Sequence, residues 1–191
     1  TYNAKDDLRY IFGLRYTEDS FSSDVTNFFG LQSYLIEDEI DETTGTAHYT
    51  FPMRLDVDPF GNYDLRMALK LSVKRQELVD KILLGHGAVG NDHPISPTQA
   101  YHASGLAQRE FDPDKAAHHY KKSGHSGAIQ LSAADAAFAG AVDASQLIAA
   151  SAAEAGIKIE VVREPNDGYW SNVWNKKGWS ACYWGGRPTC D

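Results

Sequence analysis

Long apolar runs, cysteine and an excess of positive charge are all scarce in this chain of 191 residues. No apolar stretch approaches the roughly 20 residues that cross a bilayer, so we expect no direct membrane insertion. Residues 1–7 have neither the basic start nor the apolar core of a secretion signal, and no signal peptide is expected in this chain. The formal net charge of −8 disfavours nucleic acid as a partner, because phosphate binding needs clustered Lys and Arg side chains.

The sequence also lacks the spacings of a metal or disulfide framework. Cys182 and Cys190 could pair across a turn, but their spacing alone does not define the geometry of a disulfide, and two free thiols are the simpler interpretation. The histidines show neither a zincin pair nor a zinc-type Cys–His pattern, so we predict mostly surface imidazoles, no metal site and no cofactor. These histidines are His48, His86, His93, His102, His118, His119 and His125.

Motifs of catalysis are absent as well. The chain contains no G-x-S-x-G elbow, P-loop or dinucleotide fingerprint. The glycine-rich stretch 85–90 follows a predicted helix, whereas nucleotide-binding glycine loops follow a strand. We therefore predict that the protein is not an enzyme, with an unrecognised hydrolase as the less favoured alternative.

Two parts of the chain differ in the strength of their patterns. Residues 1–45 weakly suggest a strand at 8–12, a helix at 21–31 and a strand at 34–36, before an acidic and polar break over 37–46. Residues 46–191 carry clearer signals, which predict the elements in this order: strand 48–55 with Pro52 at an edge or bulge; helices 64–71 and 74–84; a long loop 85–105; helix 112–122, with Asp112 as N-cap; strand 128–132; helix 140–155; strand 157–162; helix 169–176; strand 179–184. This alternation predicts an α/β fold: a three-layer lobe with a mostly parallel mixed sheet flanked by helices.

Several spaced segments also carry a family resemblance. In order they are PFGNYDLRMAL (59–69), KRQELVDKILLGHG (74–87), NDHP (91–94), FDPDKA (111–116) and WSACYWGG (179–186). Over about residues 46–187 the chain resembles the peptide- and nickel-binding family of ABC-transporter substrate-binding proteins (extracellular solute-binding protein family 5), specifically the second lobe. Lys74 stands where the family usually has an acidic residue, and residues 1–42 match only in their strand–helix–strand rhythm.

The resemblance implies a second-lobe core over 46–191, as in type II periplasmic binding proteins, preceded by the weakly matching segment 1–45. It implies capture of a small-molecule or peptide ligand outside the cytoplasm, in the periplasm for example. The expected partners are the missing first lobe and the membrane subunits of an ABC transporter. Because family members are considerably longer, we interpret the chain as one lobe, a fragment or an engineered piece. The alternative is a truncated lobe that binds nothing by itself.

Ligand-binding candidates follow from residue chemistry and from the family's cleft, which lies beside the last strand. Trp184 would supply a flat apolar wall, Gly185 and Gly186 would let a ligand approach the backbone, and Arg187 would grip a carboxylate with two hydrogen bonds.

Further candidates lie outside that strand. Asn91, Asp92 and His93 form a second group, in which Asp92 would meet a ligand ammonium; an Asx turn before Pro94 would equally explain Asn91 and Asp92. Tyr169 and Trp170 could line the cleft, whereas core packing is expected for Trp174 and possible for one of those two. Nickel handling in the broader family leaves a metal contact at His86 or His93 as a minor alternative.

Overall fold

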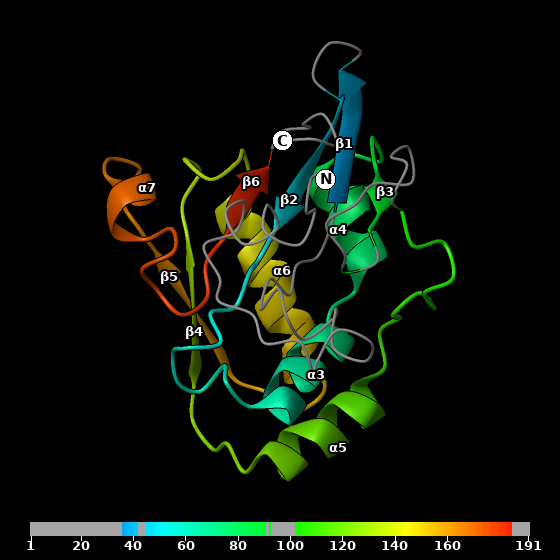
Figure 1. Cartoon of the computed structure of the whole chain (residues 1–191), viewed down its shortest axis with the longest axis vertical. Coiled ribbons are helices and arrows are strands. Elements are labelled where there is room, and N and C mark those ends of the chain that lie inside the picture. Colours follow the sequence, from blue (N-terminus) through cyan, green and yellow to red (C-terminus); the bar gives the residue numbers. More distant parts are fainter. Residues whose placement is uncertain (1–35, 42–44, 91, 93–101, 185–191) are drawn as a thin grey trace, which may run out of the picture.

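The computed structural model describes residues 36–41, 45–90, 92 and 102–184, whose arrangement is shown in Figure 1. The elements in chain order are β1 (Ile36–Asp41), β2 (Gly45–Thr50), α3 (Tyr63–Leu71), α4 (Arg75–Ile82), β3 (Ala88–Val89), α5 (Pro113–Ser123), β4 (Ile129–Ala133), α6 (Ala141–Ala153), β5 (Ile159–Arg163), α7 (Tyr169–Asn172) and β6 (Cys182–Trp184). The strand expected at 8–12 and the helix expected at 21–31 lie outside the described residues. The proposed division at residue 45 is therefore untested.

The strands form two sheets, which one isolated bridge connects. One sheet has the order β3–β1–β2–β6 with antiparallel neighbours, and the other is the parallel pair β4–β5. Ser132 in β4 bridges to Ser180 in the parallel sense, and Met53 bridges to Trp179 in the antiparallel sense. The mixed α/β fold is thus confirmed. The prediction of a mostly parallel sheet holds for β4, β5 and the segment that leads into β6, and is wrong for the larger sheet.

The physical reason for the antiparallel sheet lies in its short connection. Residues 42–44 alone separate β1 from β2, and so short a link joins only antiparallel neighbours, since a parallel crossover needs a dozen residues or more. The predicted polar break over 37–46 is also corrected, because Ile36–Asp41 is a strand. Pairing with β2 on one side and β3 on the other outweighs the low strand propensity of Asp and Glu.

Proline shapes the end of β2. The strand predicted over 48–55 ends at Thr50, and pairing resumes only at the bridge from Met53 to Trp179. Pro52 lies between them and has no N–H to donate to a ladder. The sequence predicted an edge or a bulge at Pro52; the structure instead shows β2 inside the sheet, with its pairing interrupted at this proline.

Helix boundaries follow local chemistry closely. Asn62 caps α3 by accepting a hydrogen bond from the amide of Leu65, and Asp112 caps α5 by accepting one from Lys115. Gly124 ends α5 with φ of 71°, in the left-handed region that glycine tolerates best. Lys74 occupies the N-cap position of α4, but its side chain makes no capping hydrogen bond. The side chain forms an ion pair with Glu154 instead.

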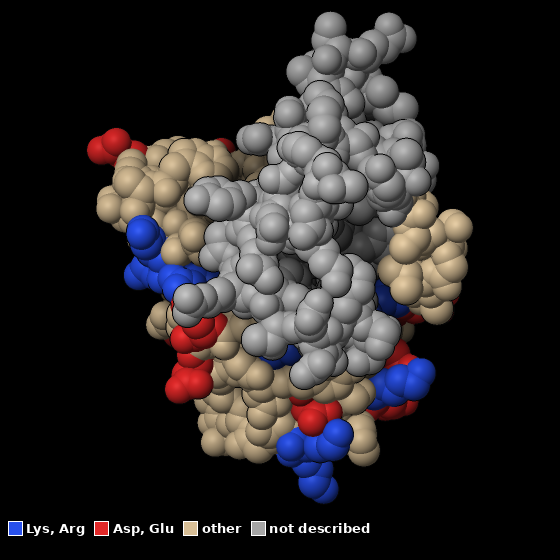
Figure 2. Space-filling model, viewed as in Figure 1, with Lys and Arg blue, Asp and Glu red and all other residues tan. Residues whose placement is uncertain are grey.

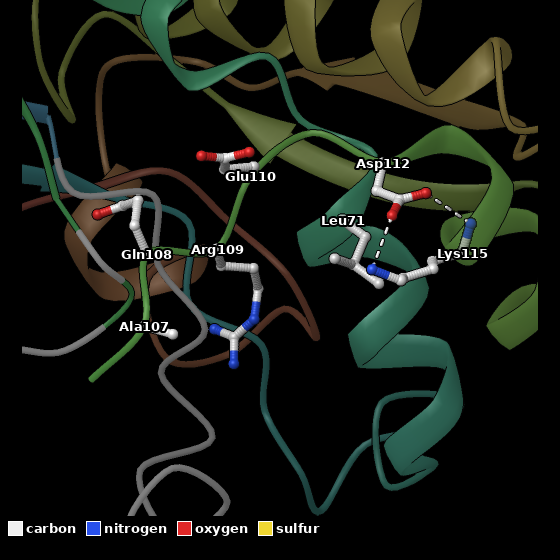
Figure 3. A pocket seen from close by; sticks show the side chains of 7 residues that line it. All are labelled: Leu71, Ala107, Gln108, Arg109, Glu110, Asp112 and Lys115. Atoms are coloured by element: carbon white, nitrogen blue, oxygen red, sulfur yellow. Dashed lines mark hydrogen bonds and ion pairs between the residues drawn. The ribbon is translucent and has the colours of Figure 1, made fainter. Parts of the chain in front are cut away.

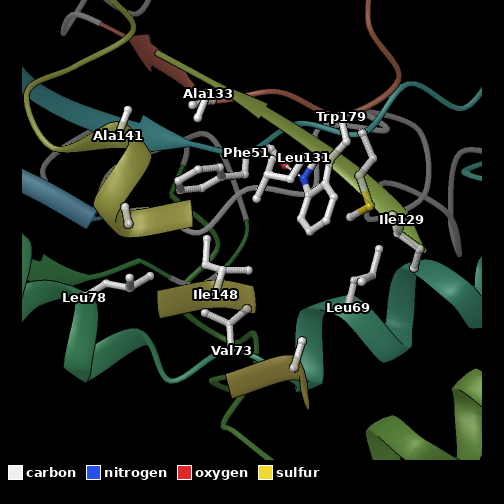
Figure 4. Close-up of a cluster of buried hydrophobic side chains, with 14 of the residues drawn as sticks. Phe51, Leu69, Val73, Leu78, Ile129, Leu131, Ala133, Ala141, Ile148 and Trp179 are labelled. Atoms are coloured by element: carbon white, nitrogen blue, oxygen red, sulfur yellow. Dashed lines mark hydrogen bonds between the residues drawn. The ribbon is translucent and has the colours of Figure 1, made fainter. Parts of the chain in front are cut away.

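The core lies among the helices α3, α4 and α6 and the sheets (Figure 4). The small residues of α6 let this helix pack closely on β4 and β5. Ile148 of α6 belongs to the same buried cluster as Leu131 of β4. Trp179 is 1% exposed, and its indole N–H donates to the carbonyl of Phe51 at 2.8 Å. The single helix predicted over 140–155 is confirmed as α6, packed on the β4–β5 pair.

Charged side chains of both signs mark the surface. On the face shown in Figure 2, several of the Lys and Arg side chains of the described residues lie next to Asp or Glu. Within the described residues, no helix combines the length and apolar character that crossing a membrane requires.

Candidate ligand-binding face at helix α7 and strand β6

One face of the connected sheets gathers the aromatic and polar side chains of interest. Side chains alternate between the two faces of a sheet, and residues paired in register point to the same face. The pairs Ser132–Ser180, Thr50–Cys182 and His48–Trp184 therefore define this face, together with Glu164, which lies two residues beyond the partner of Ser132 in β5. In Figure 1, α7 and α6 lie on opposite sides of β4 and β5, and α7 follows directly from β5. We call this surface the α7 face.

An aromatic wall crosses the α7 face. The ring of Trp184 meets that of Trp174 edge-on, with centroids 5.5 Å apart, and Trp174 meets Trp170 in the same way at 6.4 Å. Trp170 is 45% exposed, and the other two are half-buried. The wall therefore joins two of the predicted site residues through Trp174, which the sequence alone suggested for the core.

Trp184 is fixed in its orientation by β2. Its indole N–H donates to the hydroxyl of Thr50 at 3.0 Å, and Thr50 is itself buried and directed at the carbonyl of Cys182. An indole that leaves water usually needs such an acceptor, and this hydrogen bond holds the half-buried ring of Trp184 in place. The contribution of Thr50 was missed in the sequence, where a lone threonine in a strand carries no signal.

Tyr169 supports the wall from below and does not line it. It is completely buried, and its hydroxyl donates to the carbonyl of Ala181 at 2.7 Å. Burial raises the pKa of Tyr169 well above its ordinary value, with smaller contributions from Cys182 and Glu164. Its ring centroid lies 5.6 Å from that of Trp170. Of the two aromatic residues predicted near 169, Tyr169 is the one packed in the core.

His48 lies beside Trp184 in the neighbouring strand. Burial lowers the pKa of His48 from 6.5 to about 4, which makes the imidazole neutral at physiological pH. His48 is half-buried, whereas the sequence predicts that most of the histidines lie on the surface. A neutral ring next to the wall can give or accept a hydrogen bond without adding charge.

A row of hydroxyls and one carboxylate continues the face toward β5. The hydroxyl of Ser132 donates to Glu164 Oε1 at 2.8 Å, and the amide of Glu164 donates to the carbonyl of Ala133. Ser132 and Ser180 are 4% and 2% exposed. Burial also raises the pKa of the Cys182 thiol to about 12, so this free cysteine stays protonated at neutral pH.

The group predicted at 91–93 is not brought to this face by any described contact. Asp92 is buried, and its two oxygens each lie 3.0 Å from Arg75 Nη2. Arg109 donates to the same carboxylate. Asn91 and His93 lie outside the described residues, as do Gly185, Gly186, Arg187 and Cys190.

Metal ligands do not gather in the described part of the chain, where no group of three or more His, Cys, Asp or Glu side chains is placed to hold an ion. Nδ1 of His119 lies 2.8 Å from Oδ1 of Asp64, and Nζ of Lys122 lies 3.1 Å from the same oxygen. These contacts fasten α5 to α3. They hold two helices together at the end of the fold away from α7 (Figure 1).

A shallow hollow of about 360 Å³ lies near the start of α5, lined by Leu71, Ala107, Gln108, Arg109, Glu110, Asp112 and Lys115 (Figure 3). Three of its charged groups already have protein partners, because Asp112 binds Lys115 and Arg109 binds Asp92. The start of α5, where the hollow lies, is separated from α7 by the strands β4 and β5 in Figure 1. We therefore favour the aromatic wall over this hollow as the ligand site.

Comparisons with known proteins agree on one fold. The family model described as bacterial extracellular solute-binding proteins, family 5 Middle, matches residues 17–189. The periplasmic binding protein DppA from Helicobacter pylori, solved with peptide STSA, matches with a TM-score of 0.61 at 15% identity, over 81% of this chain and 28% of that one. A dipeptide-binding protein from Pseudoalteromonas sp. SM9913, solved with Met-Leu, matches with a TM-score of 0.63 at 13% identity, over 80% and 30%.

NikZ from Campylobacter jejuni, solved with Ni(L-His), matches with a TM-score of 0.61 at 17% identity, over 79% of this chain and 31% of that one. No curated protein matches the sequence significantly. The chain thus spans less than a third of the length of these three structures. At such identities the likeness establishes the fold alone.

Proposed function

Since the chain belongs to the bacterial extracellular solute-binding proteins of family 5, we propose that it forms one wall of a cleft that captures a peptide-like or other small solute for an ABC importer. Proteins of this family bind solutes without chemical turnover, and they are periplasmic or extracellular. The observation that carries the proposal is the aromatic wall of Trp170, Trp174 and Trp184.

The position of the wall supports ligand binding. In α/β sheets, ligands bind beyond the carboxyl ends of the parallel strands. Helix α7 directly follows the carboxyl end of β5, and Trp184 ends β6. Small-molecule sites combine apolar and aromatic surface with a few oriented polar groups, and the α7 face offers both.

The finer parts of the proposal concern the complete protein. In it, residues 46–191 would form the second lobe, with helices on both faces of the sheet in three layers. A first lobe would close on the wall as hinged domains do, and membrane subunits of the transporter would receive the ligand. Arg187, three residues beyond Trp184, would bind an anionic group of the ligand. Asn91, Asp92 and His93 are weaker candidates, because the buried ion pair with Arg75 already occupies Asp92.

The competing proposal is that the chain alone binds nothing. One wall leaves water on the ligand's other side, and ligand sites usually bury 70–90% or more of a drug-sized ligand. The test therefore uses the full-length parent protein. Calorimetry with Met-Leu, with the tetrapeptide Ser-Thr-Ser-Ala and with nickel plus histidine should reveal saturable binding of one of them, and mass spectrometry should recover it unchanged.

A pair of variants connects that binding to the wall. Trp184→Ala should lower the affinity for the probe by about 10- to 100-fold, since burying a large aromatic group contributes roughly 1.5–3 kcal/mol. Tyr183→Ala is the matched control, because Tyr183 lies next in the strand, on the opposite face, against Tyr49. Equal losses in both variants would refute a wall at Trp184, and a converted product would refute capture without turnover.

Arg187 has its own test in the parent protein. Arg187→Ala should weaken an acidic probe by about 30-fold or more, because removing one partner of a buried charge pair costs about 2–5 kcal/mol. Arg187→Lys should recover only part, since lysine keeps the charge and loses the planar fork. Unchanged affinity in the alanine variant would show that Arg187 does not contact the ligand.

A further inference from the structure

The turn that follows α7 lies against the segment that follows β2. The amide of Arg54 donates to the carbonyl of Gly178 at 2.8 Å, next to the bridge from Met53 to Trp179. A Cβ at position 178 would lie 2.8 Å from the ring of Phe60, so the close approach of the two segments requires glycine here. The far end of the turn is therefore fixed against the backbone of Arg54.

The side chain of Arg54 reaches the beginning of the same turn. Its Nη1 donates to the carbonyl of Asn175 at 2.9 Å and to that of Lys176 at 3.4 Å. Asn175 has φ of 52°, in the left-handed region, so the chain reverses its direction here. Carbonyls beyond the end of a helix lack helical partners, and a nearby arginine can supply the donors they need.

Asp56 orients the guanidinium of Arg54. Its carboxylate accepts a hydrogen bond from Nε at 3.0 Å and a second one from Nη2. These two contacts leave Nη1 to the carbonyls of the turn. The side chains are 31% and 67% exposed, and exposed ion pairs contribute little to stability. We therefore expect the main effect of this pair on the direction of Nη1.

Trp174, the middle ring of the aromatic wall, directly precedes the two carbonyls that Arg54 binds. Its own amide donates to the carbonyl of Tyr169 at 3.0 Å, so the backbone is held on both sides of this residue. Trp174 contacts both other rings of the wall, at centroid distances of 5.5 Å and 6.4 Å. A site whose groups are in place before binding loses less affinity to their ordering.

We propose that Arg54 is a positioning residue, which holds Trp174 in the aromatic wall through the carbonyls of Asn175 and Lys176. This inference rests on the proposed function and adds to it a residue that acts on the ligand only through the wall. Asp56 takes part by orienting the guanidinium.

The test is a double-mutant cycle between Arg54 and Trp174 in the full-length parent protein. Titration calorimetry uses whichever of Met-Leu, Ser-Thr-Ser-Ala and nickel plus histidine the wild type binds. Arg54→Ala should lower the affinity by about 3- to 10-fold, the range expected when one or two side chains must be ordered on binding. In the Trp174→Ala background the same substitution should change the affinity by less than about 2-fold, because the ring that Arg54 positions is gone.

Two further variants separate geometry from charge. Arg54→Lys should restore only part of the affinity, because lysine keeps the charge and lacks the fork that binds Asp56 and a carbonyl together. Arg163→Ala is the matched control, since Arg163 is also exposed and lies 3.7 Å from an exposed aspartate, Asp135. It points away from the α7 face by strand alternation and should leave the affinity unchanged.

Near-UV circular dichroism of the ligand-free proteins gives a measurement that needs no probe, because it reports the packing of aromatic side chains. Arg54→Ala should change the tryptophan signal, whereas Arg163→Ala should not. An equal loss of affinity with and without Trp174, or no loss in Arg54→Ala, would refute the positioning role and leave ligand capture intact. If the wild type binds none of the probes, the proposed function fails for these solutes, and a spectrum unchanged in Arg54→Ala would refute the positioning of Trp174 as well.

Discussion

The carboxylate of Asp92 accepts hydrogen bonds from two guanidinium groups inside the protein. Its side chain is 1% exposed and that of Arg75 4% exposed, so neither charge is solvated. Removing one partner of a buried pair leaves the other charge uncompensated, which costs about 3–5 kcal/mol. A side chain in this position contributes mainly to stability.

We therefore expect Asp92→Asn to lower the free energy of unfolding by about 3–5 kcal/mol, measured by urea denaturation. Asp135→Asn is the control, because its pair with Arg163 is exposed and long, and such pairs contribute about 0–1 kcal/mol. Equal stability of the two variants would contradict a structural role for Asp92 and return it to the ligand candidates.

His48 gives a second prediction at this scale. Its pKa falls from 6.5 to about 4 on folding, so between these values the unfolded chain binds a proton that the folded chain excludes. The folded state therefore loses stability as the pH falls from about 6.5 to about 4, by about 3 kcal/mol over the whole window.

Denaturation at about pH 7 and about pH 4.5 should show this loss, and His48→Gln should reduce it by about 2 kcal/mol. Hydrogen-bonding partners lower the pKa values of carboxylates such as Asp64 and Asp112. Protonation of these carboxylates in acid lowers the free energy of unfolding equally in the wild type and the variant. The difference between wild type and variant isolates His48. Parallel pH dependences would show that the imidazole is solvated.

Among the elements, α6 shows how small residues set a packing distance. Ala141, Ala144 and Ser145 are completely buried, and Ile148 lies one turn beyond Ala144 in the core. Interiors are close-packed, so even one added methylene is felt. The alanine content of this segment is thus a condition for its approach to β4 and β5.

Ala144→Leu should destabilise the fold by about 1–3 kcal/mol, the usual cost of overpacking. Ala150→Leu changes the exposed face of the same helix and should leave stability within about 0.5 kcal/mol. Thermal unfolding of the two variants measures the difference. A helix that accepted leucine equally at both positions would lie farther from the sheet than the structure places it.

The whole molecule offers one wall of the proposed cleft. Titration of the isolated 191-residue chain with Met-Leu should show binding at least about 100-fold weaker than in the parent protein, because water stays on the ligand's open side. Tryptophan fluorescence can follow both titrations, since the wall contains Trp170, Trp174 and Trp184. Equal affinities would mean that the α7 face suffices and that the first lobe takes no part in binding.

Prediction succeeded where a local rule decides the structure. Asp112 followed by proline, with Gly124 closing the segment, predicted α5 correctly because capping and left-handed geometry depend on neighbours in the chain. Trp184 and Trp170 were each proposed for the site separately, and the contact through Trp174 could not be foreseen. Their distance depends on how α7 packs over β6, which no spacing in the sequence encodes.

The sequence by itself determined the α/β alternation, most helix ends, the family and the candidate role of Trp184, because each depends on periodicity, caps or motifs along the chain. The tertiary structure alone decided three things. It paired the acidic segment of β1 as a strand, because hydrogen bonds from two neighbours outweigh propensity. It buried Asp92 against arginines that stand 17 residues away on either side. It placed Glu164 and Trp184 on one face, because that depends on the register between strands, and register is a property of the assembled sheet.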